Sequence, residues 1–189
     1  MREILLLHSA MGLRPAVGQF ADLLRAAGHT VHTPDFYEGA LFDDPAEGMA
    51  HRDEVGPKEL LNRVRSSLDG LPDDAVLAGF SLGAAFAQRL ASDRPHAQAV
   101  VLLHALSPVR GEWPGQPVQV HRYASDPFAT EADLAALKVA VESSGTTFED
   151  FVVPGSGHLF TDLGTPDGDR AARDAAAARI LDLLARTSS

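Results

Sequence analysis

Short apolar runs alternate with longer amphipathic segments along the chain, and this alternation strongly restricts the possible folds. Continuous apolar runs are typical of strands buried on both faces, whereas the longer segments have helical periodicity. We predict strands at residues 3–8, 30–33, 75–78, 99–104, 118–123 and 147–153. We predict helices at residues 15–27, 57–68, 82–92, 131–143 and 169–186. The pattern therefore predicts an α/β fold, with a mostly parallel sheet of about six strands and helices on both faces.

Residues 36–56 interrupt this alternation. They are rich in glycine, proline and acidic residues and have no clean period, so we predict a loop that can contain a short helix. No internal repeat, low-complexity tract or linker divides the chain. We expect residues 1–189 to form one domain, which leaves little room for a lid domain.

Composition excludes several classes of function. The net charge of −10 provides no basic surface for nucleic acid or an anionic membrane. The absence of cysteine excludes disulfides, thiolate metal sites and a cysteine nucleophile. The apolar run at residues 4–7 is too short for a signal peptide or a membrane span, so we expect a cytoplasmic protein. No residues have metal-ligand spacing, and we expect neither metal nor cofactor.

The sequence Gly79-Phe80-Ser81-Leu82-Gly83 lies between a predicted strand and a predicted helix. This is the setting of a nucleophile elbow, in which a sharp turn exposes a serine at the carboxyl edge of the sheet. The two glycines would remove side chains that clash in such a turn. The alternative is an ordinary glycine-rich turn with a serine that caps the helix.

A nucleophilic serine needs a base and an acid that orients the base, in the chain order serine, acid, histidine. Asp126 follows the strand at 118–123, and His158 follows the strand at 147–153. These positions predict Asp126 as the acid and His158 as the base. The main rival base is His104, which ends a strand, and the rival acids are Asp162 and Asp167. The remaining histidines are expected to be structural or solvated: His8, His29, His32, His51, His96 and His121.

An oxyanion would be stabilised by two backbone N–H groups. We expect one from Leu82 and the other from Ala10 in the loop after the first strand, with Met11 as the alternative donor. The substrate pocket should be shallow and covered by residues 36–56 and 105–116. Its predicted lining is Met11, Phe36, Trp113 and Phe160, with Tyr37, Phe42 and Phe128 as further aromatic candidates. Core packing is the alternative role for each aromatic residue.

Five segments in order resemble the dienelactone hydrolase family of the α/β-hydrolase superfamily. They are LHSAMG after the first strand, AAGHTVHTPDFYEG, the elbow GFSLGAA, the acid loop SDPF and the histidine loop GSGHLF. The resemblance covers nearly the whole chain. It implies an α/β-hydrolase fold and acyl hydrolysis by a nucleophile, an acid and a histidine.

The chain departs from the family pattern at three positions. Ser81 replaces the family's cysteine nucleophile, and Ser9 stands where the family has a glutamate. Asp162 occupies the position of an arginine that holds the substrate carboxylate, so we expect it to repel an anionic substrate. Arg52 could match a second such arginine, although a solvated loop charge is the alternative.

These observations predict a serine esterase that cleaves a small neutral ester, lactone or thioester through an acyl-enzyme. Thioester cleavage and perhydrolysis are other chemistries open to the same three residues. The alternative from a different class is a non-catalytic binding module on the same fold. A small-molecule substrate is the expected partner, and the sequence leaves open whether the chain is a monomer or a homodimer.

Overall fold

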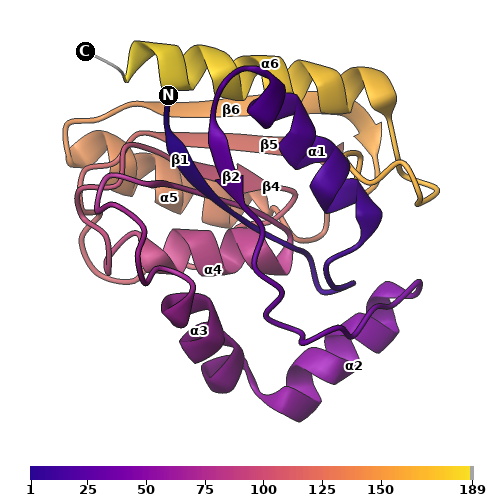
Figure 1. Cartoon of the computed structure of the whole chain (residues 1–189). Coiled ribbons are helices and arrows are strands. Elements are labelled where there is room, and N and C mark those ends of the chain that lie inside the picture. The colour runs from indigo at the N-terminus through magenta and orange to yellow at the C-terminus, as the bar shows by residue number, and fades with distance from the viewer. Residues whose placement is uncertain (188–189) are drawn as a thin grey trace.

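The six strands of the computed structural model, which describes residues 1–187, form one sheet in which every neighbouring pair is parallel. The strand order is β2-β1-β3-β4-β5-β6 (Figure 1). The strands are β1 (Glu3–Leu7), β2 (Thr30–His32), β3 (Val76–Phe80), β4 (Val100–Leu103), β5 (Val118–Ser125) and β6 (Phe148–Ser156). The predicted α/β fold with a parallel sheet is therefore confirmed.

Helices cover both faces of the sheet, as Figure 1 shows. The helices α1 (Pro15–Ala26) and α6 (Arg170–Arg186) pack on one face. The helices α3 (Pro57–Ser66), α4 (Leu82–Leu90) and α5 (Glu131–Ser143) pack on the other. None of the helices within residues 1–187 has both the length and the apolar character needed to cross a membrane.

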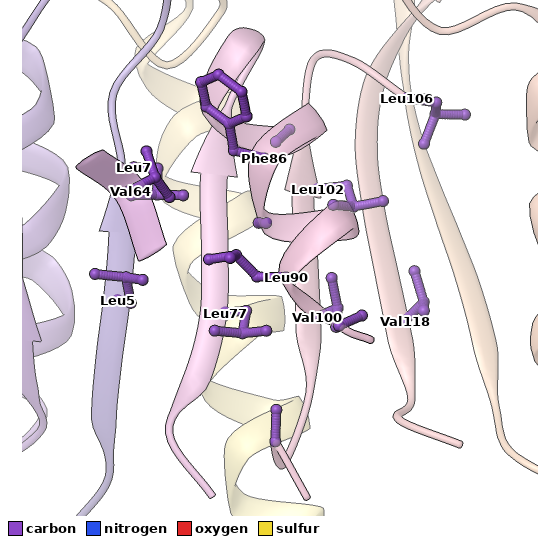
Figure 2. Packing of buried hydrophobic residues seen from close by; sticks show 14 of the residues in the cluster. Leu5, Leu7, Val64, Leu77, Phe86, Leu90, Val100, Leu102, Leu106 and Val118 are labelled. Atoms are coloured by element: carbon purple, nitrogen blue, oxygen red, sulfur yellow. The ribbon is translucent and has the colours of Figure 1, made fainter. Parts of the chain in front are cut away.

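Alternate residues of each central strand supply the two cores. Leu77, Val100 and Val118 form one row across β3, β4 and β5, and their side chains face α4 (Figure 2). Val76 and Val101 point to the opposite core with α1 and α6. All five side chains are almost completely buried. This explains why the strands read as continuous apolar runs rather than as alternating ones.

The predicted loop at residues 36–56 contains one helix, α2 (Pro45–Val55), which fills about half of it; the prediction allowed a short helix there without placing it. Asp44 caps its first turn by accepting a hydrogen bond from Ala46 N–H, and Gly56 ends it with a φ of 92°. The helix has no apolar stripe, since Gly48 is its only buried residue. Without that stripe, helical periodicity could not reveal it.

The ends of β5 and β6 also differ from the prediction. β6 continues to Ser156, three residues beyond its predicted end, and pairs there with Ser125 after an irregularity in β5. The loop that carries His158 is therefore short and anchored directly to the sheet. The connection from β4 to β5, residues 104–117, contains no helix.

Gly83 sits where α4 passes closest to β1. A Cβ atom there would lie less than 3.0 Å from the carbonyl oxygens of Leu7 and His8, which are backbone atoms at the end of β1. We expect Gly83→Ala to lower the free energy of unfolding by about 1–3 kcal/mol, through overpacking. Urea unfolding of the purified variant measures this change.

The matched control is Gly18→Ala in α1, where an added Cβ meets no atom within 4 Å. Alanine there should stabilise the protein by up to about 1 kcal/mol, because glycine is the weaker helix former. Equal effects of the two substitutions would contradict the close approach of α4 to β1.

Candidate active site

Ser81 occupies a strained turn between β3 and α4. Its φ of 51° and ψ of −110° are unfavourable for a residue that carries a Cβ atom. The Ser81 N–H donates to Leu103 O at 2.8 Å, which ties the turn to β4. The turn places the serine at the N-terminus of α4, where the partial positive charge of the helix favours an anion.

The two glycines of the elbow have the role predicted for them. A Cβ atom on Gly79 would collide with the backbone of Gly83, and one on Gly83 would collide with Leu7 and His8. Neither obstacle is a flexible side chain that could move away. Ser81 can therefore turn this sharply only because its neighbours at both positions lack side chains.

The structure brings the three predicted catalytic residues together. His158 Nε2 lies 2.8 Å from Ser81 Oγ, and His158 Nδ1 lies 3.0 Å from both carboxylate oxygens of Asp126. The Asp126 side chain is fully buried, whereas 15% of the His158 side chain is exposed. Asp126 Oδ1 also accepts a hydrogen bond from Phe128 N–H at 2.9 Å, which fixes the carboxylate. A carboxylate at Nδ1 holds the imidazole in the tautomer that leaves Nε2 free to accept a proton.

The rival acid Asp167 contacts His158 through the backbone and not through the ring. Its Oδ2 accepts a hydrogen bond from His158 N–H at 2.8 Å, and its carbonyl accepts one from Tyr123 O–H at 2.9 Å. Asp167 therefore holds the histidine loop against β5. Its geometry favours a structural role, in contrast to that of Asp126.

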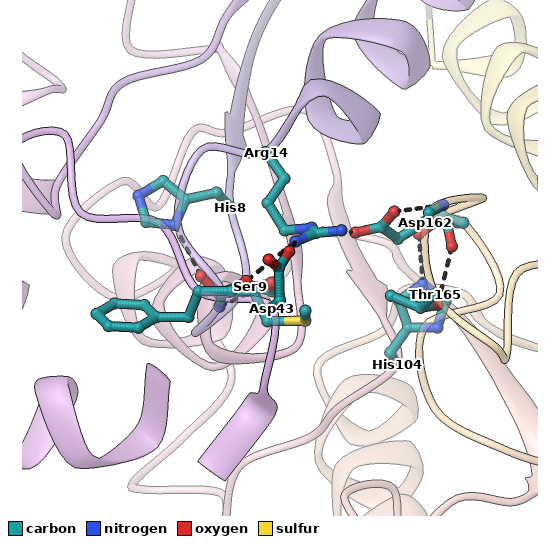
Figure 3. Close-up of polar contacts among 11 residues, drawn as sticks. His8, Ser9, Arg14, Asp43, His104, Asp162 and Thr165 are labelled. Carbon is teal, nitrogen blue, oxygen red and sulfur yellow. Dashed lines mark hydrogen bonds and ion pairs between the residues drawn. The ribbon is translucent and has the colours of Figure 1, made fainter. Parts of the chain in front are cut away.

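Asp162, the other rival acid, forms a buried ion pair. Arg14 Nε donates to Asp162 Oδ2 at 2.9 Å, and Arg14 Nη1 donates to Asp43 Oδ1 at 2.6 Å (Figure 3). Only 11% of the Asp162 side chain is exposed. Our expectation that Asp162 repels an anionic substrate assumed a free carboxylate, and the pairing with Arg14 removes that basis. The same pairing leaves Arg14 occupied.

Arg52 provides no free cation either. It lies on α2, and both Nε and Nη2 donate to Asp53 Oδ1, its neighbour in sequence. In the family pattern, two arginines hold the substrate carboxylate. Here an acid, Asp162, occupies one of these positions, and Arg52, the candidate for the other, is paired with Asp53.

The predicted oxyanion donors have free N–H groups. Within residues 1–187, neither Ala10 N–H nor Leu82 N–H has a hydrogen-bond partner in the protein. Met11 N–H, the alternative donor, is 3.2 Å from Ser9 Oγ, to which it donates. Gly12 N–H donates to Ser9 O at 3.1 Å and closes the loop. These contacts favour Ala10 over Met11 as the second donor.

Residues 9–12 form the oxyanion loop, and both His8 and α2 hold it in place. The sequence alone predicted neither contact. His8 Nδ1 donates to Ser9 O at 2.7 Å, and the His8 ring stacks on Phe36 with centroids 3.6 Å apart. Burial lowers the pKa of His8 to about 4, despite the opposing effects of the Ser9 carbonyl and Asp35. Gly48 of α2 approaches the carbonyl of Ala10 so closely that no Cβ atom would fit.

The predicted substrate-contact residues lie mostly in the core. Met11, Phe36 and Phe160 are at most 2% exposed, so they do not line an open pocket in this structure. Trp113 is also buried and donates from Nε1 to Gln116 O at 2.8 Å. It borders a cavity of about 260 Å³ between α3, α4 and residues 107–113, and this cavity includes none of the three catalytic candidates.

The accessible apolar side chains near the site are different ones. Phe128 is 47% exposed, and its ring centroid lies 4.6 Å from that of His158. Leu41 is 56% exposed and lies beside Gly12 at the end of the oxyanion loop. Both are on loops, where no periodicity distinguishes a buried residue from an exposed one.

A model of the dienelactone hydrolase family matches residues 1–188. The chain belongs to this family. It is therefore a hydrolase that acts on ester bonds. A comparison with curated protein sequences gave no match.

Solved structures similar to this dienelactone hydrolase family member share its fold. The dienelactone hydrolase-like promiscuous phosphotriesterase P91 from metagenomic libraries has a TM-score of 0.82 and 19% identity, over 99% of this chain and 87% of that chain. The protein m3DLH has a TM-score of 0.80 and 19% identity, over 100% and 87%. Esterase PE8 has a TM-score of 0.63 and 17% identity, over 96% and 92%.

Three buried histidines predict that this dienelactone hydrolase family member loses stability in mild acid. Burial lowers the pKa of His8 to about 4, that of His121 to about 3 and that of His104 well below its ordinary value of 6.5. Below about pH 6.5 the unfolded chain binds protons at these residues while the folded chain does not. The free energy of unfolding should therefore fall between about pH 6.5 and pH 4, by roughly 1 kcal/mol per pH unit for each histidine.

Urea unfolding at a series of pH values measures this slope, and His121→Phe isolates one contribution. His121 is buried, and Phe151 stacks on it, so a phenyl ring fits its surroundings. Between about pH 6.5 and pH 4, the free energy of unfolding of the variant should fall less steeply than that of the parent protein, by roughly 1 kcal/mol per pH unit. An identical pH dependence in the two proteins would show that His121 is not neutral in the folded state.

Proposed function

We propose that this chain is a serine hydrolase that cleaves small neutral esters through an acyl-enzyme, with Ser81 as nucleophile, His158 as base and Asp126 as the residue that orients His158. The observation that carries the proposal is the continuous hydrogen-bonded chain from Ser81 Oγ through His158 to Asp126, at 2.8 and 3.0 Å. Serine attack needs this order of contacts.

In the first half of the reaction, Ser81 Oγ attacks the carbonyl carbon while its proton passes to His158 Nε2. The carbonyl oxygen becomes an oxyanion, which the N–H groups of Leu82 and Ala10 stabilise. The bond to the leaving group then breaks, and the leaving group takes the proton from His158. The acyl group remains attached to Ser81, and Asp126 stabilises the imidazolium while it exists.

The second half uses water in place of the alcohol. His158 accepts a proton from a water molecule as the water attacks the acyl carbonyl, and the same two N–H groups stabilise the second oxyanion. The bond to Ser81 Oγ breaks, Oγ takes the proton from His158, and the carboxylic acid product leaves. Neither half requires a metal or a cofactor.

The surroundings of the site favour a neutral, partly apolar substrate. Arg14 is occupied by Asp162 and Asp43, and Arg52 is occupied by Asp53, so neither offers a free charge to a substrate carboxylate. The exposed Phe128 ring beside His158 provides apolar surface for an acyl or alcohol group. Esters, lactones and thioesters all satisfy these conditions.

We expect Ser81→Ala to lower kcat for p-nitrophenyl acetate by at least about 10⁴-fold, because it removes the hydroxyl that lies 2.8 Å from His158 Nε2. A fluorophosphonate probe should label the parent protein at Ser81 and should not label the variant. An unchanged melting temperature would show that the loss is not due to unfolding. Full turnover by Ser81→Ala would refute the mechanism, and absence of labelling in the parent protein would favour a non-catalytic binding module.

Phe128 tests the predicted preference for apolar substrates. Phe128→Ala should reduce the ratio of kcat/KM for p-nitrophenyl butyrate over acetate by roughly three- to tenfold, since the longer chain loses apolar contact. The control is Val139→Ala, which removes an exposed apolar side chain from α5. If both variants keep the parent ratio, Phe128 does not contact the acyl chain.

A further inference from the structure

His104 occupies an unusual backbone position directly after β4. Its φ of 75° is left-handed, although it is not a glycine, and its N–H donates to His121 O at 2.8 Å. The residue before it, Leu103, accepts the hydrogen bond from Ser81 N–H. The end of β4 is thus joined through the backbone to the nucleophile elbow. Strain of this kind persists only where the surroundings impose it.

The side chain of His104 reaches the loop that carries His158. The side chain is completely buried (His104 in Figure 3). Its Nε2 lies 2.7 Å from the hydroxyl of Thr161, which is three residues after His158. The His104 ring packs edge-on against Phe160 at 4.4 Å and lies 5.9 Å from the His158 ring. The sequence identified His104 as the rival base, but its hydrogen bond goes to Thr161 and none joins it to Ser81.

The ring can hold this loop without adding charge. Burial lowers its pKa well below the ordinary value, and the neighbouring His158 and His121 act in the same direction. A neutral ring with its proton on Nδ1 accepts the hydrogen bond of the Thr161 hydroxyl at Nε2, and Nδ1 is buried without a hydrogen-bond partner among the described residues. A cation at this position would oppose the imidazolium that forms on His158 during catalysis.

We propose that His104 is a positioning residue, which holds Thr161 and the His158 loop so that His158 Nε2 stays within 2.8 Å of Ser81 Oγ. The proposal rests on the proposed role of His158 as base. The reaction rate is sensitive to the positions of the reacting groups, and a displacement of about 1 Å can lower it by up to about 10²-fold. The effect should therefore appear in kcat more than in KM.

The experiment removes each partner of the hydrogen bond separately and then together. His104→Phe keeps a ring of similar size, and Thr161→Val keeps the shape of threonine without its hydroxyl. Each variant should lower kcat for p-nitrophenyl acetate by roughly ten- to hundredfold, with KM changed less than about twofold. Thr161→Ser should restore most of kcat, because it restores the hydroxyl. The double variant should lose no more than the worse single variant, since both act through one contact.

His121→Phe is the matched control, because His121 is equally buried but hydrogen-bonds Gln119 instead of the histidine loop. It should keep the parent kcat, and melting temperatures should be measured for all variants. If His104→Phe does not fold, the comparison of Thr161→Val with Thr161→Ser decides the question. Parent-like kcat in Thr161→Val, or losses that add in the double variant, would overturn the proposal. Loss of turnover in Ser81→Ala alongside these results would show that the proposed function still stands.

Discussion

The left-handed turn at Ser81 is the constraint on which the other features of the site depend. Such a backbone costs a non-glycine residue on the order of 1–3 kcal/mol, so surrounding contacts must impose it. β3 is held between β1 and β4, and Ser81 N–H is bonded to Leu103 O. α4 can begin at once because Gly83 allows it to lie against the carbonyl groups at the end of β1. The same close approach brings the amide of Leu82 to the edge of the sheet where Ala10 lies.

Parallel strand order then explains how distant parts of the chain meet. Ala10 follows β1, Ser81 follows β3, Asp126 follows β5 and His158 follows β6. All parallel strands end at the same edge, so each residue arrives there without any long connection. β4 lies between β3 and β5 and supplies none of these four residues. Its end instead contacts the elbow through Leu103, and we propose that it positions the histidine loop through His104.

Much of this arrangement could be predicted from sequence, because the relevant information is local. Apolar runs specify buried strands, and a serine between two glycines at a strand end specifies the sharp turn. Asp126 and His158 were identifiable because each follows a strand in the expected order, and the structure places both within 3.0 Å of their predicted partners. Their distances could not be known in advance, since β-strand register is a property of the folded sheet.

The features that sequence reasoning missed or could not place depend on contacts between distant residues. α2 has no apolar face, because what it packs against the oxyanion loop is the backbone at Gly48. The pairing of Arg14 with Asp162 joins residues 148 positions apart. Phe160 and Phe128 both looked suited to line a pocket, but one is fully buried and the other is half exposed. Burial of a loop residue depends on which elements cover it, which local sequence does not encode.

The charges around the site support our proposal that the substrate is neutral. Asp162 does not act on the substrate as a free anion, since Arg14 binds it at 2.9 Å. Asp162 instead occupies the Arg14 guanidinium, which could otherwise bind a substrate carboxylate. Asp43 accepts a hydrogen bond from Nη1 of the same guanidinium. The nearby imidazoles of His8 and His104 are kept neutral by burial, so they add no positive charge. A substrate carboxylate would lose its hydration without gaining an ion pair from Arg14 or Arg52, whereas a neutral ester would bear no such cost, and this difference supports the proposed preference for neutral esters.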